Sequence, residues 1–180
     1  MKALLIRGIG CAAALALAGC AAQTGGGRPG GVDITRMHLG QPIARAQIAV
    51  EPANAAQANS PEFQAFEAAV ERHLVRHGYA IAPNRATSEQ IARVDVRQGS
   101  RASLTTGWPA GLSPASRSGN MVATLLDVRI QRRSDGTVFW QGRAVTETAT
   151  NVARPTVVER LANALFRDFP GESGRTIRVR

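Results

Sequence analysis

The chain has 180 residues, of which 44% are hydrophobic and 4% aromatic, so it can fold as one domain whose core is mostly aliphatic. That composition excludes a wholly disordered protein. The formal charge of +9 is compatible with nucleic-acid binding, but the arginines are spread along the whole chain, and we expect no nucleic-acid partner.

The start of the chain has the pattern of a leader that directs export. Lys2 and Arg7 precede an apolar run over residues 8–18. This run is too short to cross a bilayer as a helix. A basic start, a short apolar stretch and small residues at its end are typical of a secretory signal peptide. We therefore predict a signal peptide over residues 1–19.

The end of that leader predicts lipidation. Leu17-Ala18-Gly19-Cys20 resembles the bacterial lipobox, whose cysteine is acylated, for instance with palmitate, and becomes the first mature residue. Cys11 fits less well, because Gly8 stands where the lipobox has an aliphatic residue. A lipid on Cys20 would anchor the protein to a membrane. Ala21 follows it, and by resemblance to the enterobacterial sorting rule this favours the outer membrane, facing the periplasm. The inner membrane and the cell surface stay open as alternatives.

Residues 20–31 are the predicted tether between the lipid and the folded part. They are rich in glycine and show no apolar periodicity, a composition that is typical of flexible coil. The chain beyond the tether contains no cysteine, so we expect neither a disulfide nor a thiol nucleophile there.

We place a single domain at residues 32–170. Alternation of apolar and polar residues indicates strands in its first half, at residues 34–39, 43–50, 79–82 and 91–96. A helix is predicted between the second and third of these strands. Ser60 suits its N-cap, Pro61 its first position and Gly78 its end.

The second half begins with residues 98–119, which lack a sustained period and are predicted to form a long irregular loop. A hairpin over residues 120–132 and 137–148 follows, since Asp135-Gly136 is a strong turn signal. Pro155 opens a last helix, and residues 171–180 form a basic tail in which 176–179 are a candidate edge strand. This order predicts an α+β fold, with two main helices packed on one face of a mostly antiparallel sheet.

Several of these segments resemble a known family. A helix ending His77-Gly78-Tyr79 leads into a strand, and a hairpin containing Asp135-Gly136-Thr137-Val138-Phe139-Trp140-Gln141-Gly142 precedes a helix ending Phe166-Arg167-Asp168-Phe169-Pro170. These motifs resemble the family called domain of unknown function 4136, small lipoproteins of Gram-negative envelopes, over nearly the whole mature chain. The resemblance implies the fold and an envelope location. It brings no catalytic residue and no cofactor, because the family has no assigned reaction.

The histidines and serines form no recognisable catalytic set. His73 and His77 are four apart on a predicted helix and could face one metal ion, but Leu74 stands where a metalloprotease helix carries glutamate. We interpret His77 as a core-edge residue with a backbone partner and expect no metal and no cofactor. The loop serines lack the Gly-x-Ser-x-Gly context of an exposed nucleophile; they are Ser113, Ser116 and Ser118.

The aspartates are scattered along the chain, without a pairing typical of glycosidases; they include Asp33, Asp95, Asp127 and Asp135. Asp95 and Asp127 alternate with apolar residues, so we expect both to point to solvent, while Asp135 belongs to the hairpin turn. The residues therefore favour a protein that is not an enzyme.

Trp108 is the candidate contact for a partner. It lies in the predicted loop with Arg101 and Arg117 nearby, and an aromatic side chain flanked by arginines is typical of interfaces. The alternative is that Trp108 folds back onto the domain's own core. We expect Trp140, in the hairpin, to be packed inside the domain.

We therefore expect a non-catalytic binding module at a membrane. Its basic surface would suit an envelope protein, a wall polymer or anionic lipid as partner. Two alternatives stay open. One is an envelope hydrolase with an unrecognised site, and the other is a carrier of lipids or small hydrophobic molecules, which would need a cavity between sheet and helices.

Overall fold

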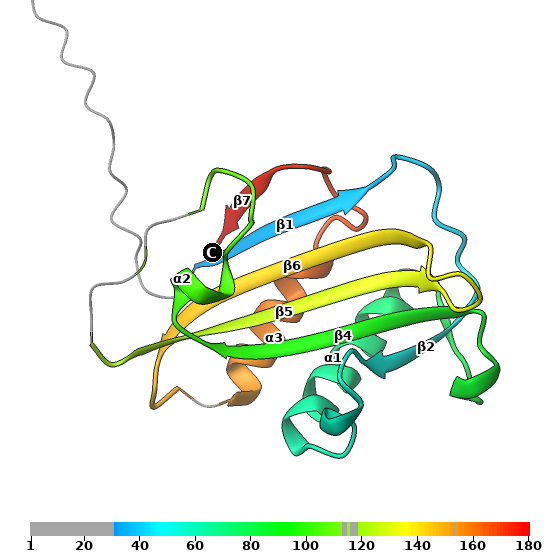
Figure 1. Cartoon of the computed structure of the whole chain (residues 1–180), viewed down its shortest axis with the longest axis horizontal. Coiled ribbons are helices and arrows are strands. Elements are labelled where there is room, and N and C mark those ends of the chain that lie inside the picture. The colour runs from blue at the N-terminus through cyan, green and yellow to red at the C-terminus, as the bar shows by residue number, and fades with distance from the viewer. Residues whose placement is uncertain (1–30, 113–114, 116–118, 153) are drawn as a thin grey trace, which may run out of the picture.

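The computed structural model describes residues 31–112, 115, 119–152 and 154–180. Within them, the chain forms a seven-stranded sheet with α1 and α3 on one face and the short α2 on the other (Figure 1). The expected α+β class is confirmed. In chain order the elements are β1 (Val32–His38), β2 (Gln47–Pro52), η1 (Ala55–Gln57), α1 (Pro61–Arg76), β3 (Ala80–Ile81), η2 (Arg85–Thr87), β4 (Gln90–Gly99), α2 (Arg101–Leu104), β5 (Met121–Arg132), β6 (Val138–Ala149), α3 (Arg154–Phe166) and β7 (Thr176–Val179).

The sheet is mixed rather than purely antiparallel. Its strand order is β3-β2-β4-β5-β6-β1-β7, and β2 pairs in parallel with both β3 and β4, while the remaining neighbours are antiparallel. The chain leaves β2 and returns to β3 through α1, and such a crossover brings the next strand back in the same direction. The centre of the sheet is the predicted hairpin, β5 and β6, whose turn includes Gly136 with a positive φ of 72°.

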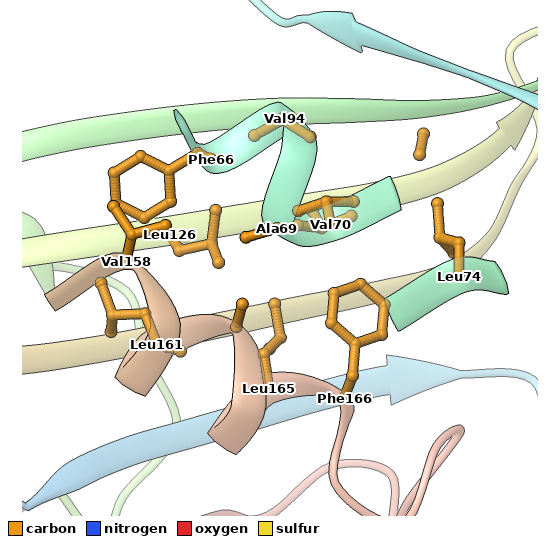
Figure 2. Packing of buried hydrophobic residues seen from close by; sticks show 14 of the residues in the cluster. Phe66, Ala69, Val70, Leu74, Val94, Leu126, Val158, Leu161, Leu165 and Phe166 are labelled. Atoms are coloured by element: carbon orange, nitrogen blue, oxygen red, sulfur yellow. The ribbon is translucent and has the colours of Figure 1, made fainter. Parts of the chain in front are cut away.

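The two long helices form one layer because each has a continuous apolar face. The Ser60 hydroxyl accepts a hydrogen bond from the Phe63 amide at 3.1 Å, which caps α1 as predicted. Figure 2 shows apolar side chains of both helices meeting over the sheet, and those labelled are Phe66, Ala69, Val70, Leu74, Val158, Leu161, Leu165 and Phe166, with Val94 and Leu126 beneath. Trp140 is fully buried in the same core, as expected.

Three segments differ from the sequence prediction. Residues 43–46 lie outside the sheet, because neither β3 nor β4 reaches them as a pairing partner. The predicted loop at 98–119 in fact includes the end of β4 and α2, whose single turn is too short to show a helical period. Beyond Pro170, β7 pairs with β1, so the candidate edge strand at 176–179 is confirmed, and the folded part extends past the predicted domain end at residue 170.

A second, smaller core lies on the other face of the sheet. Leu104 of α2 packs there with Ala123, Leu125 and Val145. The expectation of helices on one face holds for α1 and α3 only, since α2 covers part of the opposite face (Figure 1). The middle of that face carries charged side chains of β4, β5 and β6.

Candidate functional site

Some of the predicted site residues lie outside the described residues. These are the lipidation candidate Cys20, the candidate contact Arg117 and the loop serines at 113, 116 and 118. Their predictions therefore stand on the sequence alone.

Arg101 lies inside the domain. Its side chain is 5% exposed and forms an ion pair with Asp33 of β1, whose side chain is fully buried, and Glu147 lies 3.9 Å away. Arg178 of β7 also approaches Asp33, at 3.4 Å. The guanidinium of Arg101 thus ties α2 to the sheet, and the structure explains its position without an external partner.

Trp108 is half-buried, and with Leu112 it packs against the second core formed by Leu104, Ala123, Leu125 and Val145. This arrangement is the alternative that the sequence left open, in which the indole folds back onto its own domain. The structure does not bring Trp108 together with Arg101 as one exposed patch, because Arg101 is turned into the fold.

His73 and His77 both belong to the aromatic core at the end of α1. The His73 ring stacks on Phe166, with centroids 5.3 Å apart, and burial lowers the pKa of His73 below its ordinary value, with the Arg76 charge adding to the effect. His77 Nε2 lies 3.0 Å from the Phe166 carbonyl oxygen, so the interpretation of His77 as a core-edge residue with a backbone partner is confirmed. No group of three possible metal ligands occurs among the described residues.

Asp127 is buried, and the prediction that it points to solvent is wrong. Its carboxylate accepts hydrogen bonds from Gln141 Nε2 at 2.9 Å and Arg143 Nε at 2.9 Å, and Arg129 Nε lies 3.5 Å away. The long side chains of neighbouring strands cover it, as arginine stems do on exposed sheet faces. In register it faces Asp95 of β4, so the structure brings together two carboxylates that are far apart in sequence.

These two aspartates line a polar hollow of about 370 Å³ on the open sheet face. Arg97 Nε lies 3.1 Å from the Asp95 carboxylate, while the Asp127 carboxylate accepts the hydrogen bonds from Gln141 and Arg143. Because the carboxylates face guanidinium and amide donors, they are fixed as acceptors, which is the arrangement of a structural network more than of an acid–base pair.

An apolar site lies between the helical layer and one end of the sheet. It is a pocket of about 470 Å³ at the N-terminal ends of α1 and α3, within the size range of ligand sites, about 300–1,000 Å³. Its apolar lining comes from both helices and from β5 and β6, and consists of Pro61, Ala65, Phe66, Val122, Ala149, Val152, Pro155, Val157 and Val158.

The polar groups of this pocket are few. Glu62 and Arg154, on facing helices, form an ion pair of 3.3 Å, and Gln98 Nε2 donates to the Glu62 carboxylate at 2.9 Å. Thr124 and Thr148 add hydroxyl groups from the strands. An apolar interior with a few charged groups is typical of a ligand-binding site. The residues that line this pocket include no nucleophile paired with a base.

Sequence reasoning missed this pocket, although part of its signal was present. Val152, Pro155 and Val157 add apolar side chains next to the buried face of α3. Nothing local, however, says that the N-terminal turns of α1 and α3 come together at the same end of the sheet. Among the described residues, no helix is long and apolar enough to cross a membrane.

No protein-family model matches the chain. An uncharacterized protein of Zymomonas mobilis is 26% identical over an alignment of 212 positions that covers 83% of this chain and 80% of the relative. A PDZ domain protein from Parabacteroides distasonis has a TM-score of 0.51 at 9% identity, over 82% of this chain and 38% of that chain. That likeness concerns the fold alone.

Two further solved structures are similar at lower TM-scores. A protein of the domain of unknown function 4136 family from Bacteroides thetaiotaomicron has a TM-score of 0.45 at 14% identity, over 76% of this chain and 95% of that chain. A candidate lipoprotein from Caulobacter crescentus has a TM-score of 0.33 at 14% identity, over 67% and 82%.

Proposed function

We propose that the protein is an envelope lipoprotein, anchored to a membrane through Cys20, whose domain acts as a non-catalytic binding module. The observation that carries the proposal is Leu17-Ala18-Gly19-Cys20 at the end of a short apolar run. Two or more acyl chains on one cysteine are enough for stable attachment to a membrane. The body then needs no membrane-spanning helix of its own.

The location that we propose is the outer membrane, with the domain in the periplasm. Ala21 at the second mature position supports this choice over retention in the inner membrane. The binding role is supported by the apolar pocket and by the charged open face of the sheet, both of which offer recognition surfaces without a catalytic set. Candidate partners are an envelope protein, a wall polymer or anionic lipid.

The test is metabolic labelling of the full-length protein with an alkyne analogue of palmitate, followed by membrane fractionation. We expect label on the wild type and on Cys11→Ser, with both proteins in the outer-membrane fraction. Cys20→Ser should lose the label. Label that persists in Cys20→Ser, or an unlabelled wild type in the soluble fraction, would contradict the anchor.

A further inference from the structure

We propose that the pocket between the N-terminal ends of α1 and α3 binds one acyl chain of a phospholipid from the surrounding bilayer. This inference rests on the proposed function, because the anchor is what holds the pocket near lipid. Three independent features of the protein support it: the apolar interior, the place of the pocket relative to the tether, and the cation beside it.

The interior suits a hydrocarbon chain rather than a polar ligand. Phe66, Val157 and Val158 are nearly fully buried and contribute to its lining, and the strands add Val122 and Ala149. Each methylene group that enters such a site contributes about 0.8 kcal/mol, so binding increases steadily with chain length.

The pocket lies at the end of the sheet where the chain arrives from Cys20. The Thr146 hydroxyl donates to the Gly31 carbonyl at 3.0 Å, and Thr148, two residues further along β6, lines the pocket. Two residues along a strand span about 7 Å. Figure 1 shows β1 beginning at the same end as the start of α3.

The length of chain outside the structure limits how far this end can stand from the bilayer. Residues 21–31 separate Cys20 from Val32, and eleven fully extended residues reach at most about 40 Å. The opposite end of the sheet is further from the anchor by the length of β6. Of the two ends, the one with the pocket is therefore held closer to lipid.

Arg154 gives the site a group that recognises a lipid headgroup. Its side chain is 68% exposed, and its partner Glu62 is 32% exposed. Exposed ion pairs contribute little to stability, so the guanidinium can exchange the carboxylate for a phosphate, to which arginine binds in a bidentate manner. We therefore expect anionic phospholipids to be preferred.

The test uses the full-length protein in cells fed palmitic acid that carries a photoactivatable diazirine. After irradiation, the purified protein is digested and its lipid-bearing peptides are identified by mass spectrometry. We expect intact phospholipid on peptides that contain the pocket residues of α1, β6 and α3. Ala65→Trp, which fills the pocket from an exposed position on α1, should lower this yield about tenfold, the effect of roughly two lost methylene contacts.

Ala68→Trp is the matched control, since Ala68 is also exposed on α1 but does not line this pocket. It should label like the wild type. Arg154→Glu should lower the share of anionic phospholipid several-fold, whereas Arg167→Glu, another exposed arginine near α3, should not. Equal labelling of Ala65→Trp and Ala68→Trp, or label spread evenly over the surface, would overturn the inference.

The other outcomes separate this inference from the anchor. Crosslinks between the pocket and the acyl chain of Cys20 itself would overturn the choice of a bilayer lipid as occupant. Palmitate on Cys20 with no lipid on pocket peptides would overturn the inference and leave the anchor standing. Lipid on pocket peptides together with an unmodified Cys20 would support the pocket as a lipid site and overturn the anchor.

Discussion

Gly142, in the middle of β6, shows how closely the core is packed at the scale of single residues. A Cβ atom placed there would overlap the Trp140 ring and lie 2.8 Å from Leu165 Cδ1. Glycine therefore allows the fully buried indole to lie flat between the sheet and α3. The backbone of Gly142 itself is in no unusual conformation, so the requirement is one of space.

We predict that Gly142→Ala destabilises the protein by about 1–3 kcal/mol, the usual cost of overpacking a core. Gly99→Ala is the control, because Gly99 also lies in a strand but its Cβ would come no closer than 3.4 Å to any neighbour. Urea denaturation measures both. Equal unfolding free energies of the two variants would contradict the prediction, because the core around Trp140 would then accommodate the added methyl group.

Polar side chains are where sequence reasoning failed at this scale. Alternation along β5 placed Asp127 on the face opposite the main core, which is correct, but it could not reveal that arginines from β5 and β6 cover that face. Likewise Asp33 is fully buried beneath Arg101 of α2 and Arg178 of β7. Such burial depends on the register between strands and on a one-turn helix, and neither leaves a local pattern.

At the scale of elements, α3 ends in an unusual way. Arg36 of β1 lies on the helical side of the sheet, and its guanidinium donates to the carbonyl oxygens of Leu165 at 3.0 Å, Ala164 at 3.1 Å and Arg167 at 2.7 Å. The last carbonyls of a helix have no partner within the helix. A cation there also interacts favourably with the helix dipole.

We predict that Arg36→Met costs roughly 2–3 kcal/mol, since charge-assisted hydrogen bonds are lost and buried carbonyls are left without donors. Hydrogen exchange should show faster exchange in the last turn of α3. Arg167→Met, which changes an exposed arginine at the same helix end, should alter stability by no more than about 0.5 kcal/mol. Unchanged protection of α3 in Arg36→Met would refute the capping role.

The elements that could be predicted share a complete local signal. The hairpin had a turn dipeptide, α1 had a capping serine and an apolar face, and the strand at 176–179 was correct at both ends. The parallel pairing of β2 could not be read in this way, because it follows from where α1 crosses the sheet. For the site, the lipidation motif at Cys20 stays a prediction from the sequence alone, whereas the pocket arises from two helix ends that meet only in the folded chain.

At the scale of the whole molecule, the stability of the fold should depend on pH through His73. Burial lowers its pKa from the ordinary 6.5, and Arg76 and His77 act in the same direction while Glu159 opposes them. The unfolded chain therefore takes up a proton at His73 more readily than the folded chain as pH falls below about 6.5. This contribution to stability is present above that pH and is lost in mildly acidic solution.

We predict that the unfolding free energy of the wild type falls between pH 7.5 and pH 5.5 relative to that of His73→Phe. Phenylalanine keeps a ring stacked on Phe166 but cannot bind a proton. All other titratable groups are present in both proteins and largely cancel in the difference. Parallel stability curves for the two proteins over this range would disprove the assignment.

The two ends of the strand order have a consequence for how copies of the protein behave when many are crowded together. β3 contributes only two residues and β7 only four, and β7 carries Arg178. Short border strands, one of them charged, offer little backbone for a neighbouring sheet to extend by hydrogen bonding. A population concentrated on a surface would therefore resist fusing into continuous sheets, even though the long central hairpin is rich in strand-forming residues.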